Sequence, residues 1–340
     1  MCASEFGASH MQANNQDYAA AKALSPEDIP VIDFAPLIQN GDIEAVSQPL
    51  MEAALNTGFF YIKNHGIDPR LIDNALETSK EFFRLPAGQK QEVAVNTSQR
   101  GWLAPGMATL EGAKTHDLKE IFFTGPEHWS DALLAKKARI PLIADNLWPA
   151  FYPALKDNVL PYYDAVCQLG HQVLKAIAVG MGEESDFFAK RYTSPLGRGQ
   201  LVYYPRSSSE DEAQERFGAA AHTDFGVITL LLQDNNGGLQ VLNKQNEWVE
   251  AQPIDGTFVC NIGDLLHRWT NNHLSSNLHR VINRSGNERF SMPIFFDPDP
   301  DAIIDSRDFK KLANEEAKYP AVSVADYIDS KNRKAFAQYK

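Results

Sequence analysis

The sequence predicts a protein that is mainly β with additional α-helices. A C-terminal β-sandwich or barrel is flanked by helices and preceded by a mixed α/β part. Two patterns support this prediction. Between residues 200 and 297, short β-like runs alternate with turn signals such as NNGG and SGN, which is typical of antiparallel sandwiches and barrels. Before Pro195, the spacing of the apolar residues is mostly helical.

The longest helical pattern covers about residues 153–180. One apolar stripe runs along it at three- and four-residue steps, from Leu160 to Ala178. Such a stripe is typical of a helix that packs on a core. We therefore expect this helix to cover one of the sheets.

Shorter elements precede the long helix. Asp68 followed by Pro69 is typical of a helix start, because an Asp side chain caps free backbone N–H groups and proline fits the first turn. Glycines and prolines between residues 97 and 125 predict an irregular segment. In chain order we expect a strand at about 30–34, a helix at 42–56, a strand at 59–62 and a helix at 68–85.

The C-terminal half contains the predicted strands QLVYYP, VITLLLQ, GLQVLN, EWVEAQ, TFVCNI, LHRVIN and RFSMPIFF. We expect HRWTNNHLSS to be a polar loop, 207–218 to be the least ordered internal stretch, and the last 20 residues to be helical. These patterns divide the chain into a flexible tail (1–25, with stretches typical of cloning remnants), a mixed α/β region with the long helix (26–195), a β core (196–305) and a helical C-terminal segment (306–340).

Composition narrows the classes of function. The formal net charge is −12, and such an acidic chain repels phosphate backbones, which argues against a nucleic-acid substrate. No apolar run approaches the roughly 20 residues needed to span a bilayer, so we expect no membrane association. Cys2, Cys167 and Cys260 are odd in number and far apart, which predicts reduced thiols in a cytoplasmic protein.

His222-Thr223-Asp224 is the sharpest chemical feature of the sequence. In an extended segment, residues i and i+2 point to the same side, so an imidazole and a carboxylate project together. Two imidazoles and one carboxylate on one face of a metal leave positions open for other ligands, which is the arrangement of non-haem iron(II) oxygenases. The pair therefore predicts an iron site that needs one more histidine.

Three histidines could supply this third ligand. His267 and His273 fall in the expected polar loop, whereas His279 lies in the predicted strand LHRVIN. A strand holds a side chain more firmly than a loop does. We therefore favour His279 and keep His267 and His273 as alternatives.

Arg289 and Ser291 form a second pair on one face of a strand. The strand is apolar on both faces, so we expect it to be buried, and a buried arginine needs an anionic partner. The planar guanidinium suits a carboxylate, and a serine hydroxyl can add a hydrogen bond. The pair predicts either an internal ion pair or an anchor for a small molecule that carries a carboxylate.

A series of motifs occurs in order along about residues 29–305. They are IPVIDF, GFFYIKNHGI, RGW, DLKEIFFTG, YYP, AHTDFGVITLLLQDNNGGLQV, NIGDLLHRWTNN, HRVIN and RFSMPIFFDPDPDAII. This series resembles the isopenicillin N synthase-like branch of the iron(II)/2-oxoglutarate dioxygenases. The resemblance implies a double-stranded β-helix (jelly roll) core at 196–305.

The resemblance also implies roles for individual residues. His222, Asp224 and His279 would bind Fe²⁺. Arg289, Ser291 and Tyr204 would hold 2-oxoglutarate, and O₂ would be consumed. The reaction would couple oxidative decarboxylation of 2-oxoglutarate, to succinate and CO₂, to hydroxylation or a related C–H oxidation of a small molecule. Candidate substrate contacts are Phe295, Arg100, Trp102 and Arg206.

Other functions stay open at this point. In some members of this branch, including isopenicillin N synthase, the Arg-x-Ser pair holds a substrate carboxylate, and no 2-oxoglutarate is used. A protein of the same fold could also bind a ligand without catalysis, or act on nucleic acid, which the net charge disfavours. The sequence does not identify the primary substrate or the oligomeric state.

Overall fold

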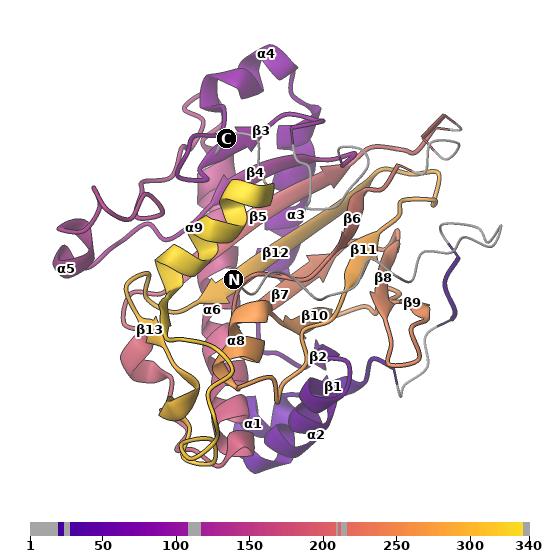
Figure 1. Cartoon of the computed structure of the whole chain (residues 1–340). Helices are drawn as coiled ribbons and strands as arrows, with labels where there is room; N and C mark the ends of the chain where they lie inside the picture. Colours follow the sequence, from indigo (N-terminus) through magenta and orange to yellow (C-terminus); the bar gives the residue numbers. More distant parts are fainter. Residues whose placement is uncertain (1–19, 24–27, 108–116, 209, 212–215, 336–340) are drawn as a thin grey trace.

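The structure is a computed structural model that describes residues 20–23, 28–107, 117–208, 210–211 and 216–335. Two β-sheets form its centre (Figure 1). The larger sheet has the order β1-β2-β10-β7-β12-β5-β4-β3 and the smaller one the order β6-β11-β8-β9. The fold combines these large sheets with flanking helices, and its core is the double-stranded β-helix expected from the sequence.

The larger sheet consists of β1 (Val31–Asp33), β2 (Phe59–Lys63), β3 (Gly101–Leu103), β4 (Glu120–Thr124), β5 (Leu196–Tyr204), β7 (Ile228–Gln233), β10 (Thr257–Ile262) and β12 (Arg289–Asp297). The smaller sheet consists of β6 (Ala219–His222), β8 (Leu239–Leu242), β9 (Trp248–Glu250) and β11 (His279–Val281). A two-stranded ribbon joins β13 (Ile303–Ile304) to β14 (Val322–Ser323). The larger sheet thus takes strands from both sides of residue 195.

The helices are α1 (Ala35–Asn40), α2 (Glu44–Leu55), α3 (Pro69–Arg84), α4 (Ala87–Lys90), α5 (Asp131–Leu134), α6 (Ala154–Met181), α8 (Asp264–Trp269) and α9 (Val324–Ala335). The long helix at 153–180, the helices at 42–56 and 68–85 and the two N-terminal strands are confirmed. Asp68 caps α3 as expected, since its side chain accepts a hydrogen bond from the backbone N–H of Arg70. Among the described residues, no helix combines the length and the apolar character that a bilayer span requires.

The structure corrects two of the predicted loops. The segment 97–125 contains β3 and β4, which form because β4 pairs with both β3 and β5; residues 108–116 lie outside the described part. The segment expected to be a polar loop begins inside helix α8, whose Leu266 and Trp269 are buried. Of the segment 207–218, residues 209 and 212–215 lie outside the described part.

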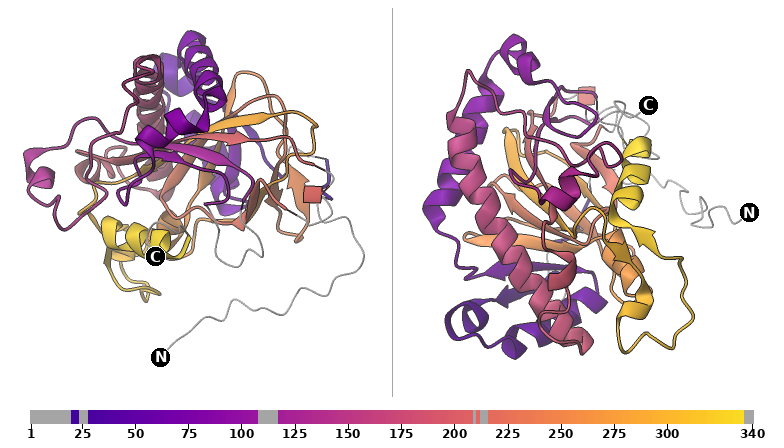
Figure 2. Two further views of the ribbon diagram at one scale, coloured as in Figure 1. Left: turned by 90° about the horizontal axis from the view of Figure 1, so that it is seen from above. Right: turned by 90° about the vertical axis from the view of Figure 1, so that its left-hand side faces the viewer.

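Helices α6 and α9 lie on opposite sides of the larger sheet (Figure 2). Tyr162 of α6 donates a hydrogen bond to the carbonyl of Met292, and Gly170 packs against the ring of Phe296. Alternate residues of β12 therefore face α6. The residues between them, from Arg289 to Phe295, face the space between the two sheets.

The contact between Gly170 and Phe296 generates a testable expectation about stability. A Cβ at position 170 would lie 2.6 Å from Cδ1 of the fully buried Phe296. We expect Gly170→Ala to destabilise the protein, because overpacking a core costs about 1–3 kcal/mol and exceeds the helix-propensity gain of roughly 1 kcal/mol. The measurement is the midpoint of urea denaturation. Gly88→Ala is the control, since a Cβ there meets nothing within 4 Å, and it should leave the midpoint unchanged or raise it.

Candidate metal centre

Three side chains converge at the edge between β6 and β11. The antiparallel pairing of these strands places His279 directly opposite His222, and Asp224 follows two residues later. The Oδ1 atom of Asp224 lies 3.9 Å from Nε2 of His222 and 3.6 Å from Nε2 of His279. All three ligand atoms lie within 4.8 Å of one another, so one metal ion fits between them.

Hydrogen bonds aim these three groups inward. Nδ1 of His222 lies 2.7 Å from the carbonyl of Ala220, and Nδ1 of His279 lies 3.3 Å from that of Asn277. With Nδ1–H donating to a carbonyl, Nε2 of each ring keeps its lone pair for a metal. The other carboxylate oxygen of Asp224, Oδ2, is held by two neighbouring side chains, Thr229 Oγ1 at 2.5 Å and Asn261 Nδ2 at 2.8 Å.

The electrostatics also favour a metal. Burial lowers the pKa of the His222 imidazole to about 4, so this ring is neutral at neutral pH. Burial alone would raise the pKa of Asp224, but the two imidazoles and the hydrogen bonds from Thr229 and Asn261 hold it below its usual value. A neutral imidazole and an ionised carboxylate are the forms that bind a metal ion. The two-nitrogen, one-oxygen donor set fits iron(II) with positions left open.

The alternative histidines lie elsewhere. His267 sits on α8, where its Nδ1 is 2.5 Å from the carbonyl of Leu274. Nε2 of His273 is 3.0 Å from the Glu315 carboxylate. Neither belongs to the cluster of metal-ligating groups, whereas His279 does.

Two adjoining cavities of about 80 and 70 Å³ open here, the first at all three ligands and the second at His222 and Asp224. Both are lined by Lys119, Gln200, His222, Asp224 and Phe295. The first also contains Tyr204, Arg289 and Ser291. These residues share one side of the sheet because side chains alternate along β5 and β12. The structure therefore places the predicted carboxylate anchor and Phe295 beside the metal ligands.

The guanidinium of Arg289 is fully buried. Its Nε donates to the carbonyl of Gly237 at 2.6 Å, and its Nη atoms lie 3.3 Å from Ser291 Oγ and from Gln233 Oε1. It also lies over the ring of Tyr204, with its Cζ 4.7 Å from the ring centroid. Among the described residues, no carboxylate forms an ion pair with it, so the internal ion pair considered from the sequence is not formed there.

Three other predicted site residues are not brought to the metal ligands. Arg100 is fully buried, and its guanidinium donates to the carbonyls of Ser98, Gln99 and Leu142. Trp102 donates its indole N–H to Glu120 at 2.8 Å, with Lys90 over its ring. The polar atoms of both side chains contact other parts of the protein, and neither residue lines the two cavities at the metal ligands.

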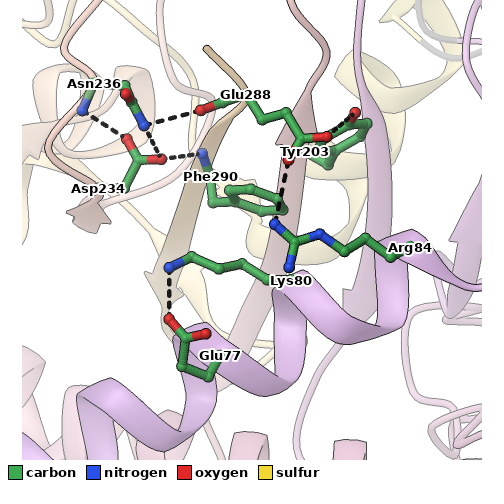
Figure 3. Close-up of polar contacts among 8 residues, drawn as sticks. All are labelled: Glu77, Lys80, Arg84, Tyr203, Asp234, Asn236, Glu288 and Phe290. Atoms are coloured by element: carbon green, nitrogen blue, oxygen red, sulfur yellow. Dashed lines mark hydrogen bonds and ion pairs between the residues drawn. The ribbon is translucent and has the colours of Figure 1, made fainter.

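Arg206 lines a different and much larger cavity, of about 660 Å³. This groove runs between α3 and the start of β12, on the side of Phe290 rather than that of Arg289. Figure 3 shows its polar contacts: Lys80 pairs with Glu77, Arg84 with Glu288, and Asp234 accepts from the backbone of Phe290. The metal-ligating groups do not line it, so its size does not make it the site of the chemistry.

Sequence reasoning missed several residues around the metal ligands. Thr229 and Asn261 lie in the predicted strands VITLLLQ and TFVCNI, to which no role in the site was assigned. Lys119 is buried beside the ligands and pairs with Asp117 at 2.9 Å. Asn332 lines the second cavity from α9. No spacing rule connects these positions to one another, and only the fold brings them together.

A further buried ion pair supports the loop that follows the ligands. Arg198 donates from Nε and Nη2 to Oδ2 of Asp297, at 3.0 and 2.8 Å. Oδ1 of Asp297 accepts from the backbone N–H of Val227 at 2.7 Å. A Cβ on Gly226 would lie 2.1 Å from this oxygen, which is why this tight turn after Asp224 requires glycine.

Two family models match the chain. Residues 29–151 match the model described as "non-haem dioxygenase in morphine synthesis N-terminal". Residues 198–298, which contain all three metal ligands and Arg289, match the model of the 2OG-Fe(II) oxygenase superfamily. The chain belongs to this superfamily.

Proteins that are similar to this oxygenase are themselves described as iron or 2-oxoglutarate-Fe(II) oxidoreductases, or were crystallised with alpha-KG. A probable iron/ascorbate oxidoreductase of Dictyostelium discoideum is 38% identical over 303 residues, which cover 81% of this chain and 82% of that protein. A 2-oxoglutarate-Fe(II) type oxidoreductase of Emericella nidulans is 33% identical and covers 93% and 92%. A full-length Neurospora crassa protein, crystallised in complex with alpha-KG and thymine, superposes with a TM-score of 0.79 at 29% identity, covering 93% and 99%.

The family and the geometry establish the class of enzyme. The protein is an iron(II)/2-oxoglutarate-dependent dioxygenase. It uses Fe²⁺, 2-oxoglutarate and O₂, and the residues whose geometry fits the iron are His222, Asp224 and His279.

The first expectation from this site concerns the ligands themselves. His279→Ala should lose iron(II) binding and turnover, because two remaining ligands cannot preserve the facial geometry. His267→Ala is the matched control and should bind iron as the wild type does. The measurement is metal content after anaerobic loading and desalting. Retained stoichiometric iron in His279→Ala would contradict the assignment.

The second expectation concerns the groups that hold Asp224. Asn261→Leu keeps a similar side-chain volume but removes the hydrogen bond to Oδ2. Iron(II) affinity should fall by about 10- to 100-fold, as is typical when a partner of a metal ligand is lost. Competition with a chelator of known affinity measures this change. Wild-type affinity in this variant would mean that Thr229 alone suffices to orient the carboxylate.

Proposed function

We propose that Arg289, Ser291 and Tyr204 bind the 2-oxoglutarate carboxylate that lies far from the iron. The observation that carries this proposal is the fully buried guanidinium of Arg289, which forms no ion pair with a described carboxylate. A buried charge of this kind is costly unless an anion joins it. Arg289 lines the same cavity as the metal ligands, so one dicarboxylate can reach both the guanidinium and the metal.

Ser291 and Tyr204 lie where they can contact a carboxylate that is bound to Arg289. Ser291 Oγ already lies beside Nη1 of Arg289, so a carboxylate there can accept from both. Tyr204 covers the guanidinium with its ring and limits the access of water. A charge-assisted, bidentate contact of this type is stronger than a neutral hydrogen bond.

The remaining residues position the reactants. When bound, iron(II) supplies the redox chemistry that couples O₂ to the decarboxylation of 2-oxoglutarate and to C–H oxidation. Thr229 and Asn261 keep Oδ1 of Asp224 turned to the metal. Apolar walls, including Leu231 and Val281, exclude bulk water from the first cavity. No protein side chain has to act as an acid or a base.

The oxidase alternative uses the same residues differently. There, Arg289 and Ser291 would hold a substrate carboxylate, and 2-oxoglutarate would not be consumed. The alpha-KG in the similar Neurospora protein favours 2-oxoglutarate. A screen for succinate formation with small-molecule substrates tests the proposal, and turnover without 2-oxoglutarate would overturn it.

We also propose that the enzyme works in the cytoplasm. Cys167 and Cys260 are free thiols in the structure, and free buried thiols are typical of proteins from reducing compartments.

The proposed carboxylate site at Arg289, Ser291 and Tyr204 predicts different losses of 2-oxoglutarate affinity for two variants of Arg289. Arg289→Ala should weaken 2-oxoglutarate binding by roughly 100- to 3,000-fold, because losing one partner of a buried charge pair costs about 3–5 kcal/mol. Arg289→Lys should recover only part of this affinity, since an ammonium lacks the planar fork. The measurement is an anaerobic titration of 2-oxoglutarate into the iron(II) protein, followed by absorbance.

Arg206→Ala is the matched control for this series. It removes an arginine from the groove on the opposite face of β12, and it should bind 2-oxoglutarate as the wild type does. Iron binding should survive in all three variants. Unchanged 2-oxoglutarate affinity in Arg289→Ala would show that this guanidinium has a structural role instead.

A further inference from the structure

The second cavity at the metal ligands contains an unusual side chain from the end of the chain. Asn332 of α9 is fully buried and lines this cavity together with His222 and Asp224. Neither Nδ2 nor Oδ1 of its amide has a hydrogen-bond partner among the described residues. A buried amide without partners is unfavourable, so this group is suited to a ligand that supplies both an acceptor and a donor.

The helix that carries Asn332 is held in place at its start. The backbone N–H groups of Val324 and Ala325 donate to the carbonyls of Ala302 and Pro300. Nearer to the cavity, Lys331 pairs with Asp264 at 3.1 Å and lies over the ring of Phe225. The position of the amide is therefore set by contacts at both ends of α9.

The charges in the wall of this cavity are already compensated. Arg198 pairs with Asp297, and Lys119 pairs with Asp117. Each cation thus has an internal anion, in contrast to Arg289 in the first cavity. This wall does not select a negatively charged ligand, and the neutral polar groups that line it are the amides of Asn332 and Gln200 and the side chain of Thr223.

The other walls are aromatic. Phe225 and Phe295 both line the cavity, and Cζ of Arg198 lies 5.0 Å from the centroid of the Phe295 ring. Aromatic faces favour a flat ring as a packing partner. A carboxamide and two aromatic rings together suit a planar, uncharged molecule with neighbouring N–H and C=O groups.

We propose that Asn332 is a substrate-recognition residue, whose amide forms paired hydrogen bonds with a neutral, planar cyclic amide that packs against Phe225 and Phe295. This proposal rests on the proposed function, because it assumes that 2-oxoglutarate occupies the first cavity. The C-terminal helix then completes the substrate site, and the ring is presented to the metal beside His222 and Asp224.

The test is calorimetric binding to the anaerobic protein loaded with iron(II) and 2-oxoglutarate. The probes are thymine and 2-pyridone, which carry neighbouring N–H and C=O groups. 1,3-Dimethylthymine lacks the N–H donors, and benzoate is a planar anion. The wild type should bind at least one of the first two probes, and at least tenfold more tightly than 1,3-dimethylthymine or benzoate.

Variants of Asn332 separate recognition from structure. Asn332→Leu should weaken binding of the preferred probe at least tenfold and remove the preference over 1,3-dimethylthymine. Its Tm should equal or exceed that of the wild type, because an unpartnered buried amide is replaced by an apolar group. Asn332→Ala serves as a second, smaller variant. Ser330→Ala, on the exposed side of the same helix, should leave binding unchanged.

Several outcomes would overturn the proposal. They are no binding of thymine or 2-pyridone to the wild type, equal affinity for 1,3-dimethylthymine, a preference for benzoate, and wild-type affinity in both Asn332 variants. A lower Tm in both variants would also overturn it, since it would show a structural role. The affinity for 2-oxoglutarate is measured in the same samples. If the proposed function fails, the wild type does not bind 2-oxoglutarate. If only the role of Asn332 fails, the wild type still binds 2-oxoglutarate.

Discussion

The iron site depends on one pairing, in which β11 lies antiparallel to β6 with His279 opposite His222. A shift of one residue in this register would turn one imidazole to the other face of the sheet. Asp224 completes the set only because Thr229 and Asn261 hold one of its oxygens. The tight turn at Gly226, tied to the larger sheet through Asp297, then keeps this loop beside both histidines.

Buried charge divides the active site into two parts. On the side of Arg289, a fully buried guanidinium has no described carboxylate partner, and this part suits an anion. On the side of α9, Arg198 and Lys119 are compensated by internal carboxylates, and the group without a hydrogen-bond partner in the described part of the chain is a neutral amide, that of Asn332. The two adjoining cavities can thus hold a dicarboxylate and an uncharged molecule next to each other, because only the first offers a buried cation without a described carboxylate partner.

Local signals predicted much of the fold. The cap at Asp68 and the stripe along 153–180 correspond to α3 and α6 within a residue or two. The segments that were missed have weak local patterns. Strands β3 and β4 form through pairing with each other and with β5, and α8 is a short helix whose apolar side is buried by neighbours. Arg100 and Trp102 were expected near the substrate, but their polar atoms contact nearby carbonyls and Glu120.

The sequence by itself determined which side chains can bind a metal or a carboxylate, and which of them lie on the same side of an extended segment. An i, i+2 spacing in an extended chain sends His222 and Asp224 to one side, and the same rule places Arg289 with Ser291. Only the tertiary structure decided which distant groups meet them. Asn261 and Asn332 come from separate elements, and no periodicity links them to the ligands. Their roles depend on strand pairing and helix packing over long sequence separations, which a local pattern does not encode.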